Sequence, residues 1–167
     1  MTIDHPALAP SHADAPRDRD DSRLRPPGRR VALAEVTTEA LDLVRHQAAV
    51  NHPSAGAVVT FVGAVRDNDR GRPVTAIEYS GHPTTARVLA EVVAEVTSRS
   101  RVEVVAVSHR LGPLQVGEAA IVVAVAGVHR AEAFEAASLL VEEVKHRLPV
   151  WKRQVFPDGT DEWVACP

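Results

Sequence analysis

Cysteine and aromatic residues are scarce in this chain of 167 residues. The only cysteine, Cys166, excludes an intramolecular disulfide and a metal site built from several cysteines. Aromatic residues make up 4% of the chain, which argues against the stacking platforms that bind single-stranded nucleic acid. Disulfide frameworks, cysteine-rich metal centres and base-stacking surfaces are therefore not expected.

Long apolar runs and an excess of positive charge are also missing. No stretch approaches the ~18 consecutive apolar residues that span a bilayer, and the first residues lack the basic flank and apolar core of a signal peptide. The formal net charge is −3, so bulk charge gives no reason to expect binding to nucleic acid or to an anionic membrane. We expect a cytoplasmic protein with neither nucleic acid nor membrane as a partner.

Several catalytic motifs are absent as well. The sequence has no G-x-S-x-G, no G-x-x-x-x-G-K-[ST] and no H-E-x-x-H, and its eight histidines include no H-x-H pair. We expect no bound metal. An enzyme with this sequence would rely on basic side chains, which suit an anionic substrate. A partner of that substrate would then have to supply the reacting atom.

The chain divides into a tail and one folded domain. Residues 1–30 hold five of the twelve prolines and eleven charged residues. Such a segment buries too little apolar surface to offset its ordering entropy, which predicts a disordered tail. A basic recruiting arm is the alternative, although the signs of its charges alternate. Residues 31–167 have the size of a single domain.

Hydrophobic periodicity predicts about three helices and six or seven strands. The predicted helices cover residues 37–50 (with Thr37 or Thr38 as N-cap), 84–100 and 130–148. The predicted strands cover residues 30–36, 56–66, 74–80, 102–110, 119–128, 150–156 and 161–166. The strand at 56–66 is expected to be buried and to form a long-looped hairpin with 74–80, and 111–118 is expected to be a turn. Because several connections are too short for a crossover helix, the sheet is largely antiparallel or mixed and the fold class is α+β.

The third predicted helix carries a candidate site residue. Counted from Phe134 at 100° per residue, its apolar arc contains Ala137, Leu140, Val141, Val144 and Leu148. Lys145 lies about 20° from Phe134, at the rim of this arc. A lysine at such a rim either extends to water or lines a concave site.

Other basic residues fall at the ends of predicted elements. His129 and Arg130 precede the third helix, where backbone N–H groups favour an anion, so they form either a phosphate clamp or a polar cap without a ligand. Arg66 ends an apolar strand. Lys152 and Arg153 follow the third helix. From position alone, an ordinary solvated surface is the favoured interpretation for these three residues, and a place in a site is the alternative.

Three segments together resemble the large, catalytic subunit of molybdopterin synthase, the MoaE family: GAVVTFVGAVRDNDRG, SHRLGPLQVGEAAIVVAVAGVHRAEAFEA and VKHRLPVWKRQVFPDGTDEWV. The resemblance implies an α/β hammerhead fold and a homodimer at the core of a heterotetramer. It also implies a small ubiquitin-like carrier subunit ending in Gly-Gly, whose C-terminal thiocarboxylate donates sulfur. The implied reaction converts cyclic pyranopterin monophosphate to molybdopterin in molybdenum cofactor biosynthesis, with no cofactor of the chain's own.

The resemblance also assigns residues. The family's two catalytic lysines correspond to Lys145 and Lys152. Its substrate-binding positions correspond to Ala64, Val65, Arg66, His129, Arg130, Lys145, Lys152, Arg153 and Gln154. Gln154 stands where an acidic residue is common in the family, and GHPTTARV replaces an aromatic-Pro-x-Met stretch, so these two contacts depart from the pattern.

Two other functions fit the same basic residues. A metal-free phosphoester hydrolase would need a carboxylate base, for which Glu78 is the obvious in-strand candidate. A non-enzymatic module would use the basic patch to dock an acidic partner tail.

Overall fold

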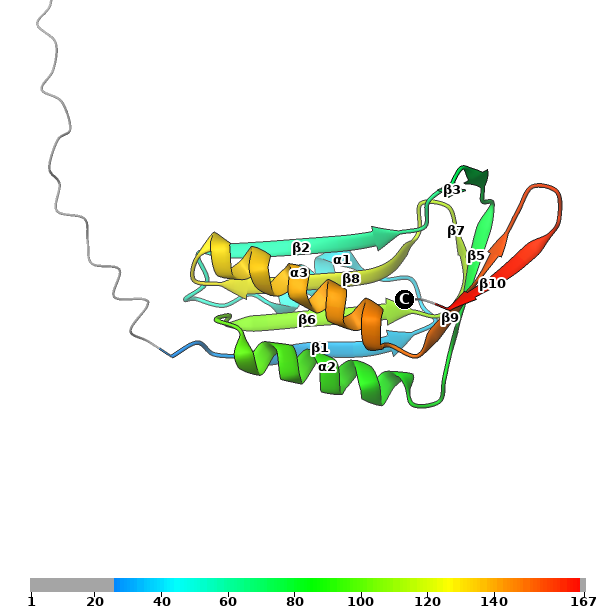
Figure 1. The fold of residues 1–167 in the computed structure, drawn as a ribbon. Helices are drawn as coiled ribbons and strands as arrows, with labels where there is room; N and C mark the ends of the chain where they lie inside the picture. Colours follow the sequence, from blue (N-terminus) through cyan, green and yellow to red (C-terminus); the bar gives the residue numbers. More distant parts are fainter. Residues whose placement is uncertain (1–25, 166–167) are drawn as a thin grey trace, which may run out of the picture.

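A four-stranded sheet forms the centre of the fold in the computed structural model, which describes residues 26–165 (Figure 1). Its strands, in spatial order, are β1 (Arg30–Thr37), β6 (Val104–Arg110), β8 (Ala119–Gly127) and β2 (Ala57–Ala64). The β1–β6 pair is parallel and the other two pairs are antiparallel. Residues 1–25 of the predicted tail, and Cys166, lie outside the described residues.

A second, smaller sheet stands at one end of the first (Figure 1). Its order is β10 (Asp161–Ala165), β9 (Val150–Val155), β5 (Ala76–Gly81) and β7 (Gly112–Gln115), with every pair antiparallel. A short ladder joins β3 (Asn68–Asp69) to β4 (Arg72–Pro73). The predicted α+β class and the mostly antiparallel sheet are confirmed.

Helices cover both faces of the first sheet. α2 (Thr85–Arg99) and α3 (Arg130–Arg147) pack side by side on one face, and α1 (Leu43–Ala49) packs on the other. Side chains alternate between the two cores, so Val105 and Val107 of β6 face α2 and α3 while Val104 and Ala106 face α1. Within the described residues, no helix is long and apolar enough to cross a membrane.

The first helix begins later than predicted. Its N-cap is Asp42, whose carboxylate accepts a hydrogen bond of 3.1 Å from the backbone N–H of Arg45, and not Thr37 or Thr38. Thr37 instead ends β1. The N-cap could not be chosen from sequence because the side chains of both Thr and Asp accept hydrogen bonds from the free backbone N–H groups of a first helical turn.

The predicted hairpin between residues 56–66 and 74–80 is wrong. β2 pairs with β8 in the first sheet, and β5 pairs with β7 and β9 in the second. β2 is also an edge strand, with Val58 50% and Val62 40% exposed, where a buried strand was predicted. Burial within one chain therefore does not account for all the apolar residues of β2.

Two boundaries also differ from the predictions. The fold begins before residue 31, because Arg30 starts β1 and the backbone N–H of Gly28 donates to Oε2 of the buried Glu103 at 3.0 Å. The segment 111–118, predicted as a turn, contains strand β7. β7 was hidden because its glycine and proline are typical of turns.

Candidate active site

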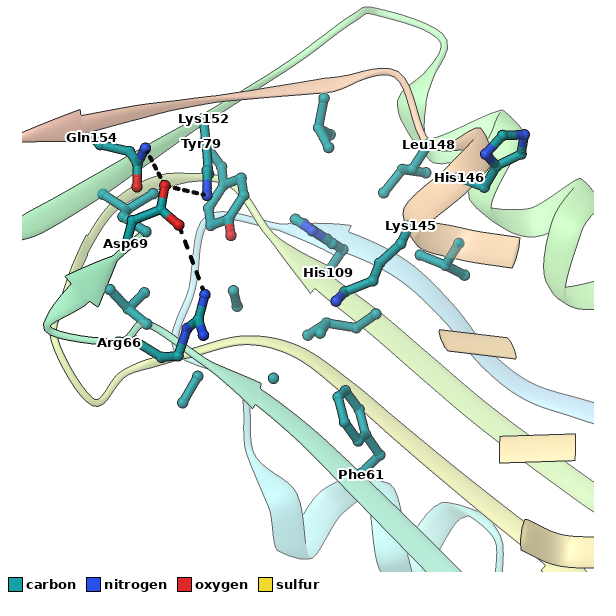
Figure 2. Close-up of a pocket in the computed structure, with 18 of the residues that line it drawn as sticks. Phe61, Arg66, Asp69, Tyr79, His109, Lys145, His146, Leu148, Lys152 and Gln154 are labelled. Atoms are coloured by element: carbon teal, nitrogen blue, oxygen red, sulfur yellow. Dashed lines mark hydrogen bonds and ion pairs between the residues drawn. The ribbon is translucent and has the colours of Figure 1, made fainter. Parts of the chain in front are cut away.

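A cavity of about 570 Å³ lies where the two sheets meet the end of α3 (Figure 2). Its walls come from the end of β2, from β3, from the inward faces of β5, β6, β8 and β9, and from the last turns of α3. A cavity of this size matches small-molecule sites, which commonly measure about 300–1,000 Å³. Six predicted site residues line it: Ala64, Val65, Arg66, Lys145, Lys152 and Gln154.

Both lysines of the chain line this cavity. Among the 19 lysines and arginines, Lys145 and Lys152 are the only lysines. Arginine stays protonated under all ordinary conditions, whereas lysine can exchange a proton with a substrate. Both lysine ammonium groups, which can exchange a proton with a substrate, therefore lie in one cavity. That the chain has only two lysines is visible in its composition and is a signal independent of the motifs.

Lys145 lies on the flank of α3 that reaches the cavity. The five residues predicted to share an apolar arc with Phe134 are buried as expected, but Phe134 itself is 63% exposed. The buried stripe contains Ala133, Ala136, Ala137, Leu140, Val141 and Val144. The error arose because small alanines, which fit close to the sheet, carry less weight in a hydrophobic pattern than one phenylalanine.

Asp69 places a carboxylate beside three of the predicted site residues (Figure 2). Its Oδ2 accepts a hydrogen bond of 2.8 Å from Nε2 of Gln154 and lies 3.8 Å from Nζ of Lys152. Its Oδ1 lies 3.9 Å from Nη2 of Arg66. The Gln154 hydrogen bond, with the nearby cations, lowers the pKa of Asp69. The predictions missed Asp69 because β3 has only two residues.

His109 is a buried wall residue that the predictions also missed. It is 7% exposed, its ring packs edge-on against Tyr79 with 5.2 Å between centroids, and its Nδ1 has no hydrogen-bond partner among the described residues. Burial lowers the pKa of His109 to about 4, so the imidazole is neutral at pH 7. The segment SHRLGPLQVGEAAIVVAVAGVHRAEAFEA contained this residue but did not show that β6 directs it into a cavity.

Arg153 does not line the cavity. Side chains alternate along β9, so Lys152 and Gln154 face the cavity and Arg153 faces away. There its Nη1 lies 3.2 Å from Oε2 of Glu78 and its Nε lies 3.1 Å from Oδ2 of Asp161. Glu78, the carboxylate base of the alternative hydrolase, is therefore not in the cavity wall either.

His129 and Arg130 lie at the opposite end of α3 from Lys145. His129 is the N-cap of this helix and Arg130 is its first residue. Fifteen residues at 1.5 Å each separate Arg130 from Lys145, or about 22 Å along the axis. Neither residue lines the cavity, so within one chain they cannot bind the same ligand group as Arg66.

The geometry defines a class of site. One arginine and two lysines surround a cavity of ligand size, with a neutral histidine in its wall. Such a site suits an anionic ligand whose reaction requires proton transfer and stabilisation of developing negative charge.

Similarity to known proteins identifies the family of this chain. Residues 36–147 match the family model described as MoaE protein. Molybdopterin synthase catalytic subunit 1 of Mycobacterium tuberculosis is 38% identical over 131 residues, covering 78% of this chain and 88% of that protein. The Arabidopsis thaliana molybdopterin synthase catalytic subunit is 36% identical over 130 residues, covering 76% of this chain and 66% of that protein. The chain belongs to the MoaE family of molybdopterin synthase catalytic subunits.

Solved structures agree on the fold. Molybdopterin synthase from Staphylococcus aureus has a TM-score of 0.72 at 28% identity, covering 78% of this chain and 95% of that one. A chain from a complex of subunits 1 and 2 of molybdopterin-converting factor of Helicobacter pylori has a TM-score of 0.61 at 20% identity, covering 78% and 88%, and shows the fold alone. The predicted resemblance, and with it a sulfurtransferase of molybdenum cofactor biosynthesis, is confirmed at the level of the family.

Proposed function

We propose that this chain is the subunit of a molybdopterin synthase that moves sulfur onto cyclic pyranopterin monophosphate. The sulfur comes from the C-terminal thiocarboxylate of a small ubiquitin-like carrier ending in Gly-Gly, so the chain needs no cofactor of its own, and the reaction takes place in the cytoplasm. The observation that carries the proposal is the convergence of Arg66 and the only two lysines on one cavity.

The chemistry follows from the reactants. The thiocarboxylate sulfur attacks an electrophilic carbon of the pterin and forms a C–S bond, while the C–O bond at that carbon breaks and its oxygen leaves as water or as a phosphate oxygen. The new bond links carrier and substrate through a thioester. Water then cleaves the thioester, so the carrier leaves as a carboxylate and the sulfur stays on the pterin. Both steps develop negative charge on oxygen and move protons, for which a cavity with two lysines is suited.

The surroundings of the two lysines differ. Lys152 lies 3.8 Å from the Asp69 carboxylate, which fits a role in stabilising negative charge as it develops. For Lys145, no carboxylate lies within 4.0 Å among the described residues, and its side chain lines the cavity from α3. We therefore assign proton transfer to Lys145 and charge stabilisation to Lys152.

A second copy of the chain supplies the rest of the site. β2 ends the strand order of its sheet and carries two exposed valines, Val58 and Val62, and a long apolar edge of this kind is a template for pairing with another strand. The exposed Phe134 lies about 180° around α3 from Glu143, which pairs with Arg99 of α2, so Phe134 is on the flank that faces away from α2. Pairing of β2 with its own copy about a two-fold axis would bury these three side chains.

The direction of β2 gives this dimer a functional consequence. The start of β2 pairs with the end of β8, directly before His129, and the end of β2 leads into Arg66 at the cavity. Eight strand residues separate these ends by about 23 Å. In an antiparallel pair of β2 strands, the first residues of one copy lie beside the last residues of the other. His129 and Arg130 of one copy would then reach the cavity of its partner and bind the substrate phosphate.

A reconstituted reaction tests the function. Purified protein is mixed with cyclic pyranopterin monophosphate and preloaded thiocarboxylated carrier. Formation of molybdopterin, which carries the two transferred sulfurs as a dithiolene, is followed in a single turnover. We expect product only when all three components are present. Phosphate release without carrier would instead indicate the hydrolase, and binding without turnover would indicate a docking module.

A further inference from the structure

Asp69 places its carboxylate between two cations of the cavity, Arg66 and Lys152 (Figure 2). The two distances, 3.9 Å to Nη2 of Arg66 and 3.8 Å to Nζ of Lys152, exceed hydrogen-bonding range, so both contacts are loose ion pairs. The 2.8 Å bond from Gln154 is a full hydrogen bond. Gln154 therefore holds Asp69, and the cations lie around it.

Gln154 is suited to this task. It is 2% exposed, and its amide N–H₂ donates to the Asp69 carboxylate. The acidic residue that is common at this position in the resembled family would be ionised at neutral pH and could not donate this bond. The hydrogen bond also lowers the pKa of Asp69, so its carboxylate is charged at neutral pH.

We propose that Asp69 is an affinity-determining residue of the cavity, whose carboxylate competes with an oxyanion of the ligand for Arg66 and Lys152. An oxyanion that pairs with both cations must replace Asp69 as their counter-ion. Asp69 thereby lowers the affinity for every anion and favours ligands of high charge, such as a phosphate. The inference rests on the proposed function only in requiring that the ligand carry an oxyanion.

Methylated lysines provide a direct readout. Because Lys145 and Lys152 are the only lysines, reductive ¹³C-methylation yields two lysine signals and that of the terminal amine, and Lys145→Arg assigns them. Inorganic phosphate is titrated against the wild-type protein, Asp69→Asn and Asp67→Asn. Asp67 is an exposed neighbour outside the cavity wall, so its substitution matches the change in net charge.

We expect the phosphate-dependent shift of the Lys152 signal to saturate at a concentration roughly three- to tenfold lower in Asp69→Asn, as expected for the loss of two loose ion pairs. Asp67→Asn should change this concentration less than about twofold. A second titration uses a peptide ending in Gly-Gly. A gain with phosphate alone assigns the oxyanion to the small-molecule substrate, and a gain with the peptide alone assigns it to the carrier tail.

Unchanged or weaker binding of both anions to Asp69→Asn would overturn the proposal, because Asp69 would then orient the two cations instead of competing for them. A Lys152 signal that responds to neither anion in any variant would overturn it as well. The titrations require no turnover. A protein that passes them but transfers no sulfur contradicts the proposed function alone, and a protein that transfers sulfur but fails them contradicts the role of Asp69 alone.

Discussion

The two ends of α3 carry the same kinds of side chain in opposite settings. At the C-terminal end, Lys145 lines a walled cavity with Lys152 and the buried His109. At the N-terminal end, Arg130 is exposed beside the start of β2 and does not line this cavity. Under the proposed function, one end is a site that the chain builds alone, and the other is half of a site that a second copy completes.

The proposed dimer would let both ends of one helix type contribute to a single ligand site. A helix of 18 residues is about 27 Å long, so its two termini cannot contact one small molecule. Two-fold symmetry brings opposite termini together without any additional chain length. Each prediction below changes one end of α3, or the edge strand that would join the two.

Removing the lysine at the cavity end should have the largest effect. We expect Lys145→Ala to slow single-turnover sulfur transfer by about 10²–10⁴-fold, the usual loss when general acid–base catalysis is removed. Stability should hold, because Lys145 is exposed and alanine is the best helix former. Arg87→Ala on α2, outside the cavity wall, is the control and should react at the wild-type rate. A near wild-type rate for Lys145→Ala would move the chemistry to Lys152.

Removing the arginine at the other end should weaken substrate binding. We expect Arg130→Ala to lower the affinity for cyclic pyranopterin monophosphate about 10- to 150-fold, from the loss of a charge-assisted contact worth about 1.5–3 kcal/mol. Equilibrium binding to the dimer measures this. Unchanged affinity in a folded Arg130→Ala protein would place the phosphate elsewhere.

Acid should destabilise the cavity end through His109. Its pKa is lowered to about 4 in the folded protein, against an ordinary value of 6.5, so the unfolded chain binds a proton first as the pH falls. The stability that depends on neutral His109 is complete above pH 6.5 and is lost as the pH falls towards 4. We expect a loss of roughly 2 kcal/mol between pH 6.5 and 4.5.

Thermal unfolding across this pH range measures the effect. His109→Gln, which cannot take up the proton, should flatten the pH dependence, whereas His146→Gln at the exposed rim should leave it intact. An equally steep curve for His109→Gln would mean that another group causes the acid sensitivity.

A charge on the edge strand should separate the two halves of the site. We expect Val58→Lys to weaken dimerisation about tenfold or more, because a lysine on an edge opposes strand pairing. Val31→Lys on β1, at the opposite edge of the same sheet, is the matched control. Sedimentation at several concentrations distinguishes them, and equal dissociation of both variants would place the interface elsewhere.

The sequence predicted local features well and distant ones poorly. The spans of α2 and α3 and the closing β9–β10 hairpin follow from periodicity and turn residues within one segment. The pairing of β2 with β8 joins residues about sixty positions apart, which no local pattern encodes. Motifs identified Lys145 and Lys152, but Asp69 and His109 required knowing which strands converge. The resemblance placed His129 and Arg130 in the same site as Arg66, but within one chain they do not line its cavity.

Mixing two impaired variants, at a substrate concentration that fills wild-type sites but not Arg130→Ala sites, tests the shared site most directly. Lys145→Ala and Arg130→Ala proteins are unfolded together, refolded as random dimers and assayed for sulfur transfer. In a two-fold dimer, half of the dimers are mixed and each mixed dimer has one intact site, so about a quarter of the wild-type activity should return. If both residues act within the same chain, no mixed dimer contains an intact site. Activity that stays at the level of the two variants assayed separately would contradict a site shared between copies.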